Sequence, residues 1–145
     1  LSSIDQNEQE MFLSLFKKIQ IKRNLTYIFI SHDLAMVRKS CNRVAVMYMG
    51  RTIELAKNEI LFKKCGHPYT RTLLSTIPTL DKNPYDKSIY LMDGEPPDPT
   101  AIGKGCSFNS RCPNPTQECK EGTTEMKLIE VQPGHWVDKC FVNCG

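Results

Sequence analysis

Apolar residues recur at helical spacing along the first part of the chain. They fall three or four positions apart, on one helix face, at Phe12, Leu15, Phe16 and Ile19. Asp5 precedes this pattern as a candidate helix cap, and Glu8 three residues later completes a capping box. We therefore predict a helix with one apolar face ahead of Leu25.

Two short runs then replace the helical pattern, residues 25–30 (LTYIFI) and 43–49 (RVAVMYM). Runs of this length that are apolar at nearly every position are typical of strands buried on both faces of a parallel sheet. Between them, Asp33 is a candidate cap for a helix over residues 33–42. The order helix, strand, helix, strand predicts an α/β fold, with a partial parallel sheet, flanking helices and right-handed crossovers.

Turn residues organise the segment that follows. Gly50 leads into residues 52–56 (TIELA), which we predict to form a hairpin with the preceding strand. Two short helices are expected next, over residues 58–64 and 69–77. Pro68 opens the second helix at a favoured first-turn position.

The character of the chain changes after Pro78. Residues 78–105 contain five of the nine prolines and little helical period, which indicates an extended connection. From Cys106 onward aliphatic residues are few, and core packing alone would not stabilise so small a segment. The cysteines are the only candidates for holding it together.

Composition excludes several classes of function. The 145 residues carry a formal net charge of +3 and no basic stripe, so nothing indicates a nucleic-acid partner. No run approaches the roughly 18 apolar residues that a membrane-spanning helix needs, and the first residues do not form a secretory signal. Seven cysteines cannot all pair within one chain, which favours a reducing compartment over a secreted disulfide framework.

His32 follows the first predicted strand closely. Ligands of open parallel α/β sheets bind outside the carboxyl ends of the strands, where an imidazole can hydrogen-bond a phosphate oxygen or a water. A single histidine after a strand is more often structural or on the surface, and by position alone we favour that reading about two to one. Consecutive Ser31, His32 and Asp33 cannot form a hydrolase triad, because triad members converge from separate elements.

Several stretches together resemble the second half of the ATP-binding subunits of oligopeptide, dipeptide and nickel ABC importers. They are YIFISHDLAMVRKSCNRVAVMYMGRTIE, HPYTRTLLSTIP, GEPP, GCSFNSRCP and GHWVDKC. The resemblance covers nearly the whole chain as far as Cys140, and HPYTRTLL with the cysteine-rich tail is specific to this importer branch. It implies the C-terminal part of an ABC ATPase domain over residues 1–65. Residues 66–145 would be the importer's small, irregular extension, which is cysteine-rich from residue 106.

The resemblance also implies roles for residues in the first part of the chain. His32 would be the switch histidine, which contacts the γ-phosphate and helps to position the attacking water. Ser2 to Asp5 (SSID) resembles the D-loop, which crosses the dimer interface towards the partner's nucleotide site, so Ser2 and Asp5 would lie at that interface. His67 is assigned no chemistry, because a helix-opening turn explains it equally well.

The implied partners are a second ATP-binding subunit, transmembrane permease subunits and, indirectly, a substrate-binding protein. Peptides are the commoner cargo of this branch and nickel is next, and the subunit would lie on the cytoplasmic face of the cell membrane. The sequence contains no G-x-x-x-x-G-K-[ST] phosphate loop, no LSGGQ-like signature and no aspartate-glutamate pair for magnesium. ATP and Mg²⁺ would therefore be cofactors of the complete subunit only, and we expect this chain alone not to hydrolyse ATP.

Four cysteines, Cys106, Cys112, Cys119 and Cys140, have the spacing C-x5-C-x6-C-x20-C. In the family this tail resembles the ligand set of a 4Fe-4S cluster, but four thiolates equally satisfy a tetrahedral zinc site, and spacing does not distinguish them. Disulfides are a further alternative, and Cys144 is a spare that could replace a ligand. The alternative function is a stand-alone metal-binding or interaction module without catalysis.

Overall fold

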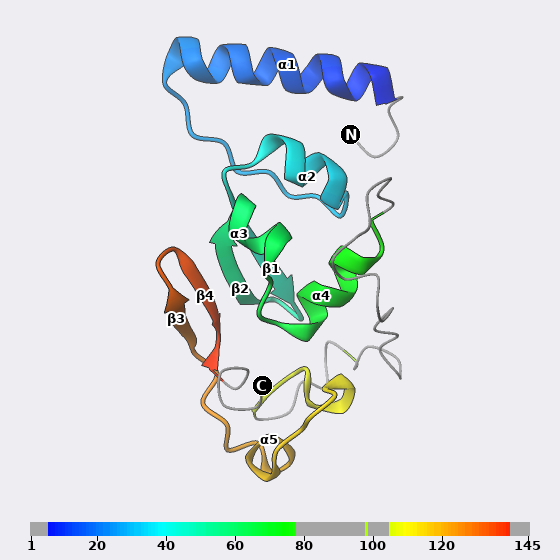
Figure 1. Cartoon of the computed structure of the whole chain (residues 1–145), viewed down its shortest axis with the longest axis vertical. Helices are drawn as coiled ribbons and strands as arrows, with labels where there is room; N and C mark the ends of the chain where they lie inside the picture. The colour runs from blue at the N-terminus through cyan, green and yellow to red at the C-terminus, as the bar shows by residue number, and fades with distance from the viewer. Residues whose placement is uncertain (1–5, 78–97, 99–104, 140–145) are drawn as a thin grey trace. The chain divides into compact units, whose positions relative to one another are not determined.

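The computed structural model describes residues 6–77, residue 98 and residues 105–139 (Figure 1). The chain divides into two compact units, Leu1–Cys41 and Asn42–Gly145. We describe each unit by itself. The boundary predicted between residues 65 and 66 stays a prediction.

Two helices form the first unit. α1 (Gln6–Arg23) confirms the first predicted helix, whereas its predicted cap Asp5 lies outside the described residues. α2 (Leu34–Ser40) begins as predicted at Asp33, whose carboxylate Oδ1 accepts a hydrogen bond from the Met36 amide at 3.0 Å. A side-chain acceptor at this position satisfies an amide that the first helical turn leaves unpaired, and this explains why the helix begins there.

Residues 25–30 do not form the predicted buried strand. Tyr27 and Phe29 pack edge-to-face on Phe16, with ring centroids 5.9 and 6.1 Å away, but Ile28 and Ile30 between and after them are 91% and 98% exposed. A strand exists only when a neighbour satisfies its backbone groups, and none of the described strands pairs with this segment. An apolar run therefore did not suffice to predict a strand here.

A four-stranded sheet is the centre of the second unit. Its strands are β1 (Arg43–Tyr48), β2 (Arg51–Lys57), β3 (Leu128–Gln132) and β4 (His135–Asp138), in the spatial order β1-β2-β4-β3. Every neighbouring pair is antiparallel, so the predicted parallel sheet is wrong. The physical reason is that two-residue turns, not helical crossovers, join β1 to β2 and β3 to β4, and strands joined in this way run antiparallel.

The predicted hairpin between the second apolar run and residues 52–56 is confirmed. Met49 and Gly50 both have positive φ, 47° and 76°, as the favoured two-residue hairpin turns require. β1 is not buried on both faces, since Val44, Val46 and Tyr48 are buried and the residues between them are exposed. This alternation is typical of an antiparallel strand with one solvated face.

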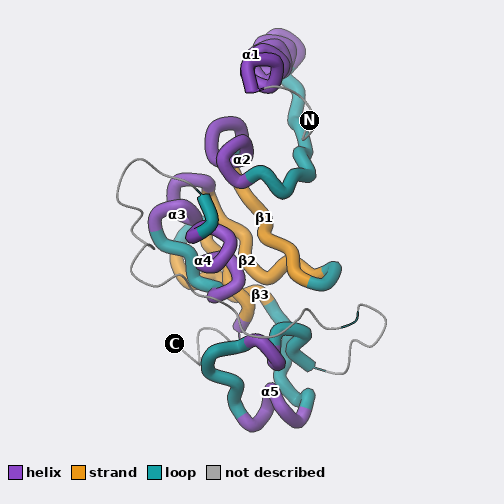
Figure 2. Tube along the Cα trace, turned by 90° about the vertical axis from the view of Figure 1, so that its right-hand side faces the viewer, coloured by secondary structure: helices purple, strands orange, loops and turns teal. Residues whose placement is uncertain are grey.

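The two predicted helices after the hairpin are also confirmed. α3 (Asn58–Lys63) packs against β1 and β2 and buries Leu61 completely, while α4 (Pro68–Ser75) has its proline in the first turn. Figure 2 shows both helices on the same side of the strands. The buried face of the sheet and these helices therefore form the core of the unit.

The cysteine-rich part consists of short elements. A 3-10 turn, η2 (Asn109–Arg111), and α5 (Gln117–Glu121) precede the β3–β4 hairpin. Two glycines are in close backbone contact in this part, Gly105 before the 3-10 turn and Gly122 directly after α5. A Cβ added to Gly105 would lie 2.5 Å from Cα of Gly122, and both residues have positive φ. Only glycine fits so close a backbone contact with this conformation.

Candidate functional site

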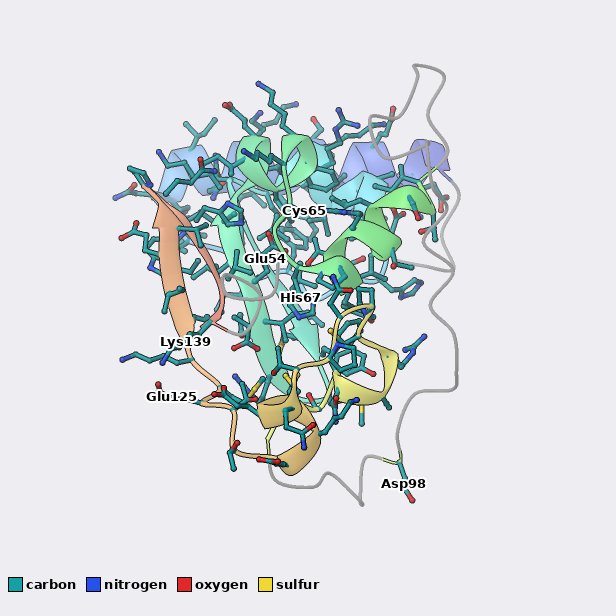
Figure 3. The ribbon with its side chains drawn as sticks, turned by 60° about the horizontal axis from the view of Figure 1, so that its bottom comes forward. Glu54, Cys65, His67, Asp98, Glu125 and Lys139 are labelled. Atoms are coloured by element: carbon teal, nitrogen blue, oxygen red, sulfur yellow. The ribbon has the colours of Figure 1, made fainter. Side chains whose placement is uncertain are left out.

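A buried carboxylate on β2 holds the turn that opens α4. Glu54 is completely buried, and its two oxygens accept hydrogen bonds from the backbone amides of Gly66 (2.7 Å) and His67 (3.0 Å). Figure 3 labels Glu54 on β2 and His67 at the start of α4. A Cβ on Gly66 would lie 2.7 Å from a Val137 methyl, so the turn packs directly on β4 as well. The glutamate thus ties the strand to the start of the helix.

The same carboxylate reaches a histidine 81 positions later in the chain. His135 on β4 is 3% exposed, and its Nε2 lies 2.7 Å from Glu54 Oε1. The other ring nitrogen, Nδ1, lies 3.2 Å from Nε2, the side-chain amide nitrogen of Gln132. An amide N–H donates to Nδ1, which places the ring proton on Nε2, where it donates to Glu54. Glu54 therefore also fixes β4 to β2.

His67 caps α4 and is buried among aromatic rings. Its Nδ1 accepts a hydrogen bond from the Tyr69 amide at 3.1 Å, and the side chain is 1% exposed. Burial lowers the pKa of His67 to about 4, so the imidazole is neutral at physiological pH. A neutral ring is what this cap needs, because a protonated Nδ1 cannot accept.

Phe108 connects the cysteine-rich segment to this core. The ring is 2% exposed and lies 5.0 Å from the His67 ring and 5.3 Å from the Tyr48 ring, in edge-to-face geometry. Tyr69 completes the cluster, 4.8 Å from Tyr48. Phe108 lies two residues after Cys106 and four before Cys112 in the sequence, so it anchors the loop that carries both cysteines.

The sulfur of Cys119 is buried beside two threonine hydroxyls. It is 5% exposed, and the hydroxyls of Thr116 and Thr124 lie 3.1 and 3.5 Å from its sulfur. Burial raises the pKa of the Cys119 thiol, but these hydrogen bonds outweigh burial and the charge of Cys106, and the net pKa is below its usual value.

The remaining predicted ligands are placed only in part. Cys112 ends the 3-10 turn and is half-buried, while Cys140 and the spare Cys144 lie outside the described residues. No three described cysteine, histidine or acidic side chains come close enough together to hold a metal ion, and no disulfide joins two described cysteines. Thiolates are donors that suit iron and zinc, but no three of the described cysteines converge on one point.

His32 lies apart from these groups in the sequence and belongs to the first unit. Its side chain is exposed at the bend before α2, between Ser31, whose hydroxyl accepts from the Asp33 amide at 3.0 Å, and Asp33 itself. The bend holds His32 ahead of the helix, free of the core. Ser2 and Asp5, the predicted interface residues, lie outside the described residues.

Comparison with known proteins now identifies the family. The family described as "Oligopeptide/dipeptide transporter, C-terminal region" matches residues 53–119, from the strand that carries Glu54 to Cys119. The chain contains the C-terminal region of an oligopeptide/dipeptide ABC-transporter ATP-binding subunit. The match confirms the family predicted from the sequence motifs. The Glu54 carboxylate and the turn that it holds at Gly66 and His67 both lie inside the matched region.

Named relatives agree with this assignment. The putative oligopeptide transport ATP-binding protein YkfD of Bacillus subtilis is 38% identical over 94% of this chain, and the oligopeptide transport ATP-binding protein AppF of the same species is 40% identical over 94%. The di/tripeptide transport ATP-binding protein DppF of Pseudomonas aeruginosa is 38% identical over 89%. The chain spans about 40% of the length of each of these relatives, 41%, 41% and 40% respectively.

Sequence reasoning did not find the buried network of this transporter region. Glu54 and His135 were not predicted as partners, and Phe108 was not predicted as an anchor. A charged residue inside the otherwise apolar TIELA run was the available signal for Glu54, because an inward-facing charge needs a partner.

In the part of the chain that the structure describes, no helix has the length and apolar character to cross a membrane.

Proposed function

We propose that this chain forms part of the ATP-hydrolysing subunit that powers peptide import through an ABC transporter. The observation that carries the proposal is the family match over residues 53–119, supported by relatives whose names describe peptide transport ATP-binding proteins. Peptides are the proposed cargo and nickel is the alternative. ATP and Mg²⁺ act in the complete subunit, where a phosphate loop supplies the backbone amides that this sequence lacks.

His32 is the proposed switch histidine of that subunit. Its exposed position at the bend before α2 supports the assignment, because a group that contacts nucleotide must be accessible. Ser2 and Asp5 are proposed to face the nucleotide site of a second ATP-binding subunit. Permease subunits would hold the assembly at the cytoplasmic face of the membrane, with a substrate-binding protein delivering cargo.

The cysteine-rich tail is proposed to bind a metal centre. Cys106, Cys112, Cys119 and Cys140 would hold a 4Fe-4S cluster, with zinc as the alternative, and bound metal would stabilise a segment that has few aliphatic residues. The buried, hydrogen-bonded thiol of Cys119 supports this role.

The central proposal is tested with His32→Ala in the complete subunit. We expect ATP turnover to fall at least about 100-fold, the typical contribution of a positioned acid-base group, while nucleotide binding stays within a few-fold of wild-type. Steady-state phosphate release and nucleotide binding are measured on the same preparation. His67→Asn is the matched control and should keep wild-type turnover, because that histidine is buried and caps a helix, a role that asparagine can also fill. Wild-type turnover in the His32 variant would contradict the assignment.

A further inference from the structure

One oxygen of the buried Glu54 carboxylate serves two segments that are far apart in the sequence. Oε1 accepts from the Gly66 amide at 2.7 Å, and it also lies 2.7 Å from Nε2 of His135 on β4. Oε2 accepts from the His67 amide at 3.0 Å. A carboxylate oxygen has two lone pairs, so both donors fit on Oε1. The β4 histidine and the turn before α4 therefore meet at a single atom.

Contacts on either side extend this arrangement into a series of hydrogen bonds. Nδ1 of His135 lies 3.2 Å from Nε2 of Gln132, the last residue of β3. At the other end, Nδ1 of His67 accepts from the Tyr69 amide in the first turn of α4. The series thus runs from the edge strand β3 through β4 and β2 to a helix. Linked hydrogen bonds in a buried, low-dielectric setting strengthen one another.

β4 also contacts the same turn directly. Val137, two residues after His135, is 2% exposed, and a Cβ on Gly66 would lie 2.7 Å from one of its methyl groups. Real Cβ atoms do not approach other atoms so closely, so only glycine lets the turn pack on β4 in this way. Removal of β4 would expose Gly66 and take away one of the three donors of Glu54.

The β3–β4 hairpin, residues 128–138, is attached to the rest of the sheet over a short length. β1 and β2 pair at six positions, whereas β4 and β2 pair at three: Ala56 with His135, Leu55 with Trp136, and Glu54 with Val137. The ion pair between Arg51 and Asp138, at 3.4 Å, adds a contact at the end of this ladder. Short attachments of this kind open at lower free energy than the core of a domain.

We propose that the β3–β4 hairpin is a releasable strap, which keeps the turn at Gly66 and His67 ordered by placing the His135 donor on Glu54. When the hairpin leaves β2, Oε1 loses a donor and the carboxylate is no longer held facing the turn. The start of α4 then loosens, while the β1–β2 hairpin stays paired.

The strap connects two parts of the chain that the family match separates. The turn lies inside the matched residues 53–119, and the hairpin follows them in the sequence. The order of the matched region therefore depends on residues outside it. The series of contacts from Gln132 to Tyr69 contains no cysteine, so the strap does not require the proposed metal centre.

His135→Leu is the informative variant, because leucine fills a similar space and removes the donor. His135→Gln is the rescue, since its side-chain amide nitrogen can take the place of imidazole Nε2 and donate to Glu54. Glu130→Gln is the matched control. Glu130 Oε1 accepts from the Gly134 amide at 2.9 Å, so this substitution alters the hairpin but none of the bonds to Glu54.

The measurement is amide hydrogen exchange, resolved by residue with NMR on the full chain. We expect His135→Leu to accelerate exchange of the Gly66 and His67 amides by about 10-fold to 100-fold relative to the β1–β2 amides of the same sample, because a buried hydrogen bond to a charged group is lost. His135→Gln and Glu130→Gln should keep the wild-type ratio. The β1–β2 amides act as the internal reference for general stability.

Each of three results in the variants would overturn the strap. They are a wild-type ratio in His135→Leu, equal acceleration of the turn and the β1–β2 amides, and failure of His135→Gln to restore protection. If His135→Leu does not fold, the wild-type chain in dilute urea decides instead. The turn amides should then open together with the β3–β4 amides and before the β1–β2 amides, and opening together with β1–β2 would overturn the strap.

Discussion

The second unit buries two carboxylates completely, Glu54 and Asp138, and surrounds them very differently. Glu54 accepts hydrogen bonds from two backbone amides and one imidazole, all between 2.7 and 3.0 Å. Asp138, on β4, pairs with the guanidinium of Arg51 at 3.4 Å, and among the described residues its Oδ2 has no hydrogen-bond partner. The first carboxylate is satisfied, while the second is buried at a cost.

The difference shows how this small unit is held together. Glu54 connects three segments that are far apart in the sequence, so its hydrogen bonds are part of the fold itself. Asp138 connects only β4 to the start of β2, and burial raises the pKa of its carboxyl despite the nearby Arg51. We therefore expect the two sites to respond in opposite ways to neutral replacements.

The largest expected effect is at the satisfied site. Glu54→Gln replaces one acceptor oxygen by an NH2 group that faces other donors, so at least one buried donor loses its acceptor and the remaining hydrogen bonds lose their charged partner. An unsatisfied buried group costs about 1–3 kcal/mol and a hydrogen bond to a charged group contributes about 1.5–3 kcal/mol, so we expect a summed loss of about 3–5 kcal/mol. Urea unfolding followed by fluorescence of Trp136, the single tryptophan and a neighbour of His135, measures the loss. Glu59→Gln on the exposed surface of α3 is the control. Equal unfolding midpoints for the two variants would show that the Glu54 network contributes little.

An intermediate effect is expected at the cap beside Glu54, and it should depend on pH. Because the pKa of His67 is about 4 in the folded chain and near 6.5 when unfolded, the unfolded state binds the extra proton between these values. Stability should therefore be complete above about pH 6.5 and fall as the pH drops towards 4, by roughly 3 kcal/mol from this group.

His67→Asn tests that dependence, since asparagine caps a helix without titrating. We expect the variant to lose much of the acid-side decrease in melting temperature, whereas the exposed His32→Asn should keep it. The measurement is thermal unfolding by circular dichroism from pH 4 to pH 7. A wild-type pH profile in the His67 variant would assign the acid sensitivity to other groups.

The smallest effect is expected at the unsatisfied site, with the opposite sign. A raised pKa means that ionised Asp138 opposes folding at neutral pH and that this penalty disappears as the pH falls through the raised value. Asp138→Asn in the metal-free chain should therefore be neutral or stabilising by less than about 1 kcal/mol at pH 7, with no gain at acidic pH. Destabilisation by more than this in urea unfolding would indicate that Arg51 contributes more than burial costs.

Features that depend on neighbouring residues were predicted correctly from the sequence. Asp33 and Pro68 each begin a helix, and Gly50 begins a hairpin, because caps, first turns and two-residue turns are set by side chains and φ angles within a few positions. The motifs around His32 and His67 likewise indicated the transporter family, which the family match confirmed.

Features that depend on distant pairing were not predictable in the same way. The run at residues 25–30 has the composition of a buried strand, yet no described strand pairs with it, and the sheet is antiparallel where a parallel one was predicted. Apolar periodicity indicates which residues can be buried, but it carries no information about the partner strand or its direction.

The sequence by itself determined the helices α1 to α4, the first hairpin and the family. Only the tertiary structure decided that β4 joins β2, that Glu54 receives His135 from 81 positions away, and that two threonine hydroxyls meet at Cys119. Local elements follow from backbone sterics over a few residues. Which distant groups meet follows from how the whole unit buries its apolar surface and satisfies its polar atoms.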